Sequence, residues 1–351
     1  MRMHLRHELA WGAVLFALAT LCGAHELVAQ EFEIGIIDFY GLHRVSLADA
    51  RRALTFTEGD TISLASDEPP AFLAESEHRL ATLPGVVRAR TNIVCCDQGR
   101  LIIYVGVEEK GGPTTHFRNP PEGNVRLPAD IVQAGDDFSE ALVAAVQRGD
   151  AAEDDSQGHA LFHDPATRAV QERFIVFAAR DEDLLRRVLR ESSDAGQRAI
   201  SAQVLGYVVD KQSVVGDLAD AMSDPSEDVR NNAMRALMVF AKATPTKAQP
   251  TPQIPYDPFI GLLNSLVWTD RNKSSLALME LSESRDSELL ARLRKGAMQP
   301  LVDMARWKNE GHAIPALLIL GRIGGWSDDD ARAAWSRGER EKVIEAARTS
   351  H

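Results

Sequence analysis

Apolar pairs recur at one helical phase through the second half of this 351-residue chain, and this repeat constrains the fold more than any other feature. The anchors that align the pairs are Arg168, Arg198, Arg230, Arg271 and Ala313, spaced by 30, 32, 41 and 42 residues. An apolar pair follows each anchor, from Phe174-Ile175 to Ile319-Leu320. Repeats of this length indicate stacked units that bury their apolar sides only against their neighbours.

The segments between the anchors complete each unit. Apolar residues at helical spacing over 184–190, 214–222 and 288–295 predict a second helix, so each unit should be a helical hairpin. We therefore expect an α-solenoid over 139–326, beginning with a helix that starts near Ser139, and capping helices over 327–351. The Pro-rich segment 243–258 lengthens one spacing and should project as a loop.

One unit carries the most specific pattern. Asp224-Pro225 is followed by Arg230, Ala233 and the pair Ala236-Leu237, and this series resembles the HEAT repeat. Asp164-Pro165 with Arg168 has the same beginning. In HEAT families the Asp and Arg cap helices and bridge adjacent units. The resemblance therefore implies structural roles, and no catalytic ones, for Asp164, Arg168, Arg198, Asp224, Arg230 and Arg271.

Residues 31–110 have the pattern of a separate α+β domain. The β-branched and aromatic run 32–40 predicts a strand, and helices are expected over 47–54, after the N-cap Ser46, and over 72–82. Alternation over 87–93 predicts an edge strand, whereas the apolar run 101–107 predicts an inner strand. The expected order is β-α-α-β-β, followed by a linker over 111–138 that is rich in Pro, Gly and Asn.

This order, with Gly41 after the first strand, a Leu83-Pro84-Gly85-Val86 step and a last strand ending at Glu108, resembles a POTRA domain. POTRA domains are exported modules that bind or guide polypeptides, often by adding a partner strand to a sheet edge. The resemblance implies a protein-binding edge at Val86, Arg88, Arg90, Asn92 and Val94. The alternative is a generic β/α domain that only caps the helical array.

The first 29 residues have the pattern of a signal peptide. Arg2 and Arg6 precede an apolar run over 9–21, and small residues follow at Gly23, Ala24 and Ala29. The run is shorter than the roughly 20 residues that a membrane span requires. We expect cleavage, export to the periplasm or cell envelope, and no transmembrane span afterwards. An uncleaved N-terminal anchor is the alternative.

Charge and cysteine content limit the partners and the chemistry. The chain has 39 basic and 51 acidic residues, a net charge of −12, which disfavours binding to nucleic acid or anionic membranes. Cys95 and Cys96 are neighbours, and we expect two thiols in preference to a strained disulfide, because good disulfide geometry needs a larger Cα separation.

No motif of the chain predicts catalysis, a metal or a cofactor. Gly321, Gly324 and Gly325 fit the end of a helix, and the acidic run 328–330 fits a helix start after Ser327. His159 and His163 stand beside the helix start at Asp164, where solvent-facing caps are the expected outcome. Three tryptophans near the end should pack the last unit: Trp307, Trp326 and Trp335.

These features together predict a non-catalytic interaction or scaffold protein of the bacterial cell envelope. It would bind protein partners through the helical-repeat surface and through strand addition at the POTRA-like edge. Two alternatives stay open. A lyase-type or accessory enzyme built on a HEAT array would show titratable groups converging in a closed pocket. A self-assembling structural protein would show a large apolar patch on its surface.

Overall fold

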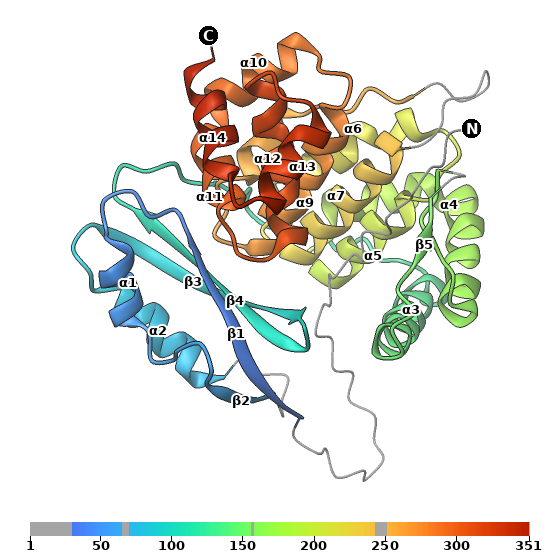
Figure 1. The fold of residues 1–351 in the computed structure, drawn as a ribbon. Coiled ribbons are helices and arrows are strands. Elements are labelled where there is room, and N and C mark those ends of the chain that lie inside the picture. The colour runs from blue at the N-terminus through green and yellow to red at the C-terminus, as the bar shows by residue number, and fades with distance from the viewer. Residues whose placement is uncertain (1–29, 65–69, 156–157, 243–250, 351) are drawn as a thin grey trace.

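The computed structural model describes residues 30–64, 70–155, 158–242 and 251–350, so the expected signal peptide lies outside the described residues. The chain forms a small sheet domain followed by a helical array (Figure 1). The sheet has the order β2-β1-β4-β3. Its strands are β1 (Gln30–Tyr40), β2 (Thr61–Leu64), β3 (Val86–Asp97) and β4 (Arg100–Glu109). β1 and β4 are parallel at the centre, and β3 is an antiparallel edge strand.

The sequence-based order misses β2, and the observed order is β-α-β-α-β-β. β2 contains only four residues, too few to show an alternating pattern. Helices α1 (Leu47–Ala53) and α2 (Ala71–Ala81) lie where predicted, and they cover one face of the sheet. Ser46 caps α1 by accepting a hydrogen bond from the Asp49 backbone N–H.

Gly41 ends β1 in a conformation that only glycine adopts readily, with φ of +79°. A Cβ atom at this position would lie 2.1 Å from the carbonyl oxygen of Val107 in β4. The parallel pair of central strands therefore approaches more closely here than any side chain would allow.

The helical array begins earlier than the sequence predicts. Its first helix starts at Ala129, inside the segment predicted as a linker up to residue 138. The apolar residues at 131, 134 and 138 lie on one buried face, but acidic residues at 130, 136 and 137 between them obscure the helical spacing in the sequence. The helices of the array are α3 (Ala129–Gln147), α4 (Pro165–Glu191), α5 (Ala195–Leu205), α6 (Lys211–Ala221), α7 (Glu227–Lys242), α8 (Asp257–Leu262), α9 (Trp268–Leu281), α10 (Ser287–Gly296), α11 (Met298–Ala305), α12 (Glu310–Ile323), α13 (Asp328–Ser336) and α14 (Arg340–Thr349).

The helices that carry the repeat anchors pack successively into one layer, in the order α4, α5, α7, α9 and α12. α4 contains a kink at Asp181 that divides it into an anchor helix and a second helix. α6 packs against α4 and α7, α8 against α9, and α10 against α12, while α13 and α14 pack against α12 at the C-terminal end of the array. A two-stranded hairpin, β5 (Glu153–Asp154) with β6 (Leu161–Phe162), lies against α4. This is the predicted repeat architecture of helical hairpins with two capping helices.

The sheet domain packs directly on the array instead of being tethered to it. The sheet face opposite α1 and α2 contributes Ile36, Tyr40, Val94, Ile102 and Tyr104 to the same hydrophobic core as the helices. α9 and α12 are consequently buried on nearly all sides. The sheet and the array therefore share one hydrophobic core, although the sequence has the pattern of a separate domain over 31–110.

Residues 111–127 form an extended strap along the array, which the sequence predicted as a linker. The backbone N–H of Arg118 donates to the Ser223 carbonyl, and the N–H of Ser193 donates to the Gly123 carbonyl. The Leu127 N–H donates to the side chain of Gln197. The strap thus crosses the turns before α7 and then α5, in the direction opposite to the order of the repeats.

Candidate functional site

Buried arginines connect one unit of the array to the next. Arg198 of α5 donates from Nε and Nη2 to the two carboxylate oxygens of Asp224, over 2.9 and 2.8 Å. Its Nη1 donates to the Ser192 carbonyl at the start of its own unit. Both side chains are buried. Burial opposes ionisation of Asp224, but the hydrogen bonds from Arg198 and the strap residue Arg118 hold its pKa below the ordinary value.

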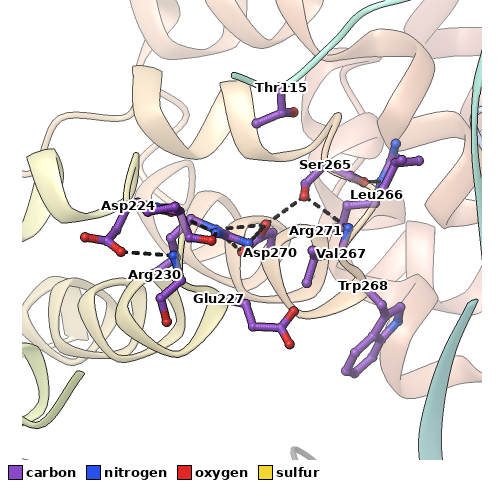
Figure 2. Close-up of polar contacts among 12 residues, drawn as sticks. Thr115, Asp224, Glu227, Arg230, Ser265, Leu266, Val267, Trp268, Asp270 and Arg271 are labelled. Carbon is purple, nitrogen blue, oxygen red and sulfur yellow. Dashed lines mark hydrogen bonds and ion pairs between the residues drawn. The ribbon is translucent and has the colours of Figure 1, made fainter. Parts of the chain in front are cut away.

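The next unit repeats this arrangement, as Figure 2 shows. Arg230 of α7 donates to both oxygens of Asp270 over 2.8 to 3.1 Å, and its Nη1 donates to the Asp224 carbonyl. Ser265 also donates to Asp270. Burial raises the pKa of Asp270, and the hydrogen bonds from Arg230 and Ser265 oppose that change. The ring of Phe117 in the strap covers the Arg230 guanidinium at 3.9 Å.

The first anchor does not join this series. Arg168 forms an ion pair with Glu172 of its own helix. Asp164 caps α4 by accepting from the Thr167 N–H, and it pairs with Arg148. Of the six residues that the HEAT resemblance marks as structural, Asp164 and Arg168 therefore make local contacts at the first unit. Arg198, Asp224 and Arg230 bridge adjacent units, and Arg271 contacts the sheet instead.

Arg271 of α9 ends the series without a carboxylate. Its Nε donates to the Ser265 carbonyl over 2.6 Å, which repeats the contact that Arg198 and Arg230 make within their own units. Its guanidinium lies 4.2 Å from the ring centroid of Tyr40 in β1. Nη1 is buried and has no hydrogen-bond partner among the residues that the structure describes. Burial lowers the pKa of Arg271, although an arginine stays charged at any physiological pH.

An aromatic cluster joins the sheet to the array beside Arg271. Tyr104 of β4 stacks on Trp268 with the ring centroids 5.4 Å apart, and it lies 4.5 Å from the ring of Trp307. His312 of α12 contacts both Tyr104 and Trp268. Trp307 therefore packs the sheet against the last anchor helix, and not only the last unit as predicted. Trp326 and Trp335 pack against the core of the last unit and its cap.

The residues of the predicted binding edge lie in different environments. Arg88 forms an ion pair with Glu108 of β4, and Arg90 pairs with Glu227 at the start of α7. Val86 is partly buried against the sheet core, and Val94 is buried in the shared core. The side chains of Arg88 and Arg90 remain partly exposed to solvent.

Asn92, a residue of the predicted binding edge, faces the array and is not free to bind a partner. Its Nδ2 donates to the Leu266 carbonyl and to Tyr40 Oη, and its Oδ1 accepts from the Trp268 backbone N–H. Even-numbered residues of β3 share the face that packs on the array. The polar residues at these positions therefore contact the ends of helices as well as solvent. Asn92 holds the start of α9 against the sheet.

Thr91 presents the outer edge of β3. Its backbone N–H and its hydroxyl both donate to one carboxylate oxygen of Glu77 in α2, over 2.6 and 2.7 Å. No motif of the sequence includes Glu77, so this contact could not be predicted. A side chain of the same domain thus occupies one position on the edge that a partner strand would use.

Cys95 and Cys96 form a disulfide at the end of β3, so the expectation of two free thiols is wrong. The expectation applied the usual Cα separation of a disulfide, whereas these Cα atoms are 3.1 Å apart across a cis peptide bond. Cys95 packs against the sheet core and Cys96 is exposed. The adjacent Asp97 accepts a hydrogen bond from Asn309, which caps α12.

A hollow lies between α5 and α7, and its volume is about 310 Å³ with the open solvent at its mouth included. Tyr207, Asn232 and Arg235 line it, and Arg235 pairs with Glu153 of β5. On the neighbouring helix, burial lowers the pKa of Lys273 to about 8. His159, expected as a solvent-facing residue, stacks on Tyr207 with ring centroids 5.8 Å apart. Periodicity assigns these α7 and α9 positions to helices but does not reveal that the β5–β6 hairpin covers them.

Within the described residues, no three or more His, Cys, Asp or Glu side chains gather as metal ligands. The same residues contain no helix that is both long and apolar enough to cross a membrane. The absence of such features assigns no function by itself.

Comparison with known proteins finds no matching family model and no matching curated protein. Among solved structures, the chain is similar to designed armadillo repeat proteins. One is 14% identical over 53% of this chain and 93% of its own length, with a TM-score of 0.34. Another, solved in complex with the peptide (KR)4, is 15% identical over 62% of this chain and 98% of its own, with a TM-score of 0.36. These similarities assign no function to this chain.

Proposed function

We propose that this chain is a non-catalytic scaffold that binds an extended polypeptide segment as an added strand at β3. The observation that carries the proposal is the position of β3, whose outer side pairs with no strand among the described residues. An unpaired strand edge offers backbone donors and acceptors in a row, which is how extended peptides are recognised. β3 contains 12 residues, long enough for several such contacts.

The edge is accessible on the side of the sheet away from the array. Val87 on that side is 54% exposed, and Arg88 and Arg90 are exposed on the side that faces the array. Both arginines already pair with carboxylates, so their charges discourage casual pairing without presenting a strongly basic surface. The shared core fixes the opposite face of β3, so a partner strand would meet a rigid edge.

We also propose a family for each of the two domains. The sheet domain would be POTRA-like and the array HEAT-like, and the array would pack against the aromatic face of the sheet. Export to the periplasm or cell envelope follows from residues 1–29. A fusion of residues 1–40 to a reporter that is active only outside the cytoplasm tests export, and an inactive, cytoplasmic reporter would contradict it.

The binding test uses a photo-crosslinking amino acid at Val87. Val176 provides the control, because it is 61% exposed on the array, far from the edge in sequence. A partner that strand addition recruits from envelope extracts should crosslink at position 87 and not at 176. Equal capture at both positions would contradict the proposal.

Proline substitution separates strand addition from side-chain contact. Residues two apart on a strand present their N–H groups to the same side, so Ala89 shares the outward orientation of Thr91. Ala89→Pro removes one outward N–H and leaves the contact between Thr91 and Glu77 in place. Thr91→Pro also breaks that contact, which makes it the less specific test. Unchanged crosslinking by a folded Ala89→Pro protein would move the binding site to the array.

A further inference from the structure

Arg271 is the one arginine of the bridging series that lacks a carboxylate, and it lines a hollow at the junction of the sheet and the array. We propose that Arg271 binds the carboxylate group of a ligand in this hollow. The site is separate from the β3 edge and does not depend on the proposed function.

The repeat shows which contact is missing. Asp224 stands six residues before the anchor Arg230, and Asp270 stands one residue before the anchor Arg271. The corresponding positions before the next anchor, Ala313, are Trp307 and His312, and neither supplies a negative charge. The sheet places the ring of Tyr40 against the guanidinium instead. A ring face attracts a cation but offers no acceptor in the plane of the guanidinium.

The guanidinium is buried and incompletely bonded. Arg271 is 3% exposed, and the bond from Nε to the Ser265 carbonyl is the only hydrogen bond that it makes within the described residues. Nη1 is enclosed without an acceptor. Burying a charged group without its hydrogen bonds costs free energy. A hydrogen bond from this guanidinium to an acceptor therefore contributes more binding free energy than the same bond at the surface would.

The hollow gives an acceptor room to reach Arg271. It encloses about 350 Å³, part of it open to solvent, between the ends of β1 and β4, the start of the strap, and α9 and α11. Asn264 lies on its wall, and the Asn264 side chain makes no hydrogen bond within the described residues. This volume counts the open solvent at the mouth and the enclosed space is far smaller, so the hollow admits only a small group such as the end of a chain.

The three carboxylates that also line the hollow already have donors. Glu109 accepts from the backbone N–H groups of residues 43, 44 and 45. Asp303 accepts from the Gly41 N–H and from Gln299. Glu108 accepts from Arg88 and Thr114. The group in the hollow that still needs a hydrogen-bond acceptor is therefore the Arg271 guanidinium. The surrounding carboxylates disfavour a ligand with two negative charges, such as phosphate.

A planar monocarboxylate satisfies both conditions. It accepts two parallel hydrogen bonds from an arginine, as the carboxylates at Arg198 and Arg230 do from Nε and Nη2. At Arg271 Nε already donates to Ser265, so the two terminal nitrogens are left for the ligand. The carboxylate has two possible sources, a small free acid or the C-terminal end of a polypeptide.

The test measures saturation transfer by NMR from the full chain to the methyl group of acetate, with chloride at the same ionic strength as reference. We expect saturable transfer to acetate. Arg271→Lys keeps the charge but loses the fork, so acetate should bind about tenfold more weakly or worse. Arg292→Lys, at an exposed arginine paired with Asp257, is the matched control and should bind as the parent does.

A second variant keeps the test decisive if Arg271→Lys does not fold. Asn264→Asp changes no volume and supplies a carboxylate within the hollow. It should abolish acetate binding while the protein stays folded. No saturable transfer to the parent chain would overturn the proposal, and so would parent-like binding by a folded Asn264→Asp protein.

Two peptides identify the source of the carboxylate. Acetyl-trialanine with a free C-terminus should displace acetate if the hollow accepts chain ends, and the same peptide with a C-terminal amide should not. Displacement by neither peptide, with acetate binding intact, would indicate a small free acid. Equal displacement by both peptides would show that the carboxylate is not what is recognised and would overturn the proposal.

Discussion

Tyr104 of β4 and His312 of α12 meet across the boundary between sheet and array, with 2.7 Å between the tyrosine Oη and the histidine Nδ1. The two residues are 208 positions apart in the chain. Burial lowers the pKa of His312 to about 4, so its imidazole is neutral at pH 7 and Nδ1 can accept the tyrosine proton. A protonated imidazole would lose this acceptor in the middle of the aromatic cluster.

Stability should therefore fall with acid through His312. The unfolded chain binds a proton at His312 near pH 6.5, whereas the folded chain binds it only near pH 4. The unfolded state thus carries more protons between these values, and the contribution is complete above pH 6.5 and is lost as the pH falls toward 4. The loss should be on the order of 3 kcal/mol. Urea unfolding at pH 7.5 and 4.5 measures it, and His312→Gln should lose less stability than the parent over the same interval.

The bidentate pair between Arg230 and Asp270 should be costly to break from one side. Asp270→Asn leaves a buried guanidinium without its counter-charge, and we expect a loss of about 3 to 5 kcal/mol in the free energy of unfolding. Arg292→Ala removes an exposed pair with Asp257 and should cost about 1 kcal/mol or less. Similar losses for the two variants in urea unfolding would show that the buried bridges do not hold the units together.

Two glycines with the same backbone conformation should respond differently to alanine. Gly41 and Gly99 both have φ of +79°, but a Cβ atom at Gly41 meets the Val107 carbonyl, and one at Gly99 meets nothing within 4 Å. Gly99→Ala should cost about 1 kcal/mol through backbone strain alone. Gly41→Ala adds a clash with the central strand and should cost at least about 2 kcal/mol more. Equal melting temperatures for the two variants would contradict the close approach of β1 and β4.

Glu77 should act as a guard on the β3 edge. Glu77→Ala frees the outward N–H of Thr91, so crosslinking of a partner at position 87 should increase. The same change should promote self-association through paired edges, measurable by analytical ultracentrifugation. Glu75→Ala, at an exposed residue of the same helix, serves as the control. A monomeric Glu77→Ala protein with unchanged crosslinking would show that the contact has no role at the edge.

Removal of the sheet should leave the array incompletely folded. A fragment that begins at Ala129 lacks Tyr40 and Tyr104, so Trp268 and Trp307 lose their cover. We expect strong binding of a hydrophobic dye and a broad thermal transition by circular dichroism. A sharp transition at the temperature of the full chain would restore the description of the array as an independent module.

Local features of the fold follow from the sequence, and long-range ones do not. Ser46, Asp164 and Ser327 cap helices as their neighbours predict, because a cap depends on a few adjacent residues. The docking of β1 and β4 on α9 and α12 joins residues more than 150 positions apart, and no local pattern encodes it. Asn92 illustrates the limit, since a polar residue on an alternating strand looks the same whether it meets water or the start of a helix.

The candidate carboxylate site was hidden for a related reason. The anchor alignment places Arg271 beside Arg198 and Arg230 as an equivalent residue. The three arginines differ in the group that each contacts. Arg198 and Arg230 each bind a carboxylate, whereas Arg271 lies against the ring of Tyr40. A repeat in the sequence predicts the contacts that the units have in common. That Arg271, the last arginine of the series, lacks a carboxylate partner can be seen only in the three-dimensional structure.

The shared core also determines when the sheet can complete its packing during synthesis of the chain. The strands that carry Tyr40 and Tyr104 leave the ribosome well before the surface that covers them, which extends from Trp268 to His312. Until then the finished sheet has an aromatic face with no cover, and contacts between distant parts of a chain form slowly. A nascent chain of this protein should therefore need protection from a chaperone until this surface has been made, and the helices that carry it complete the sheet as much as they complete the array.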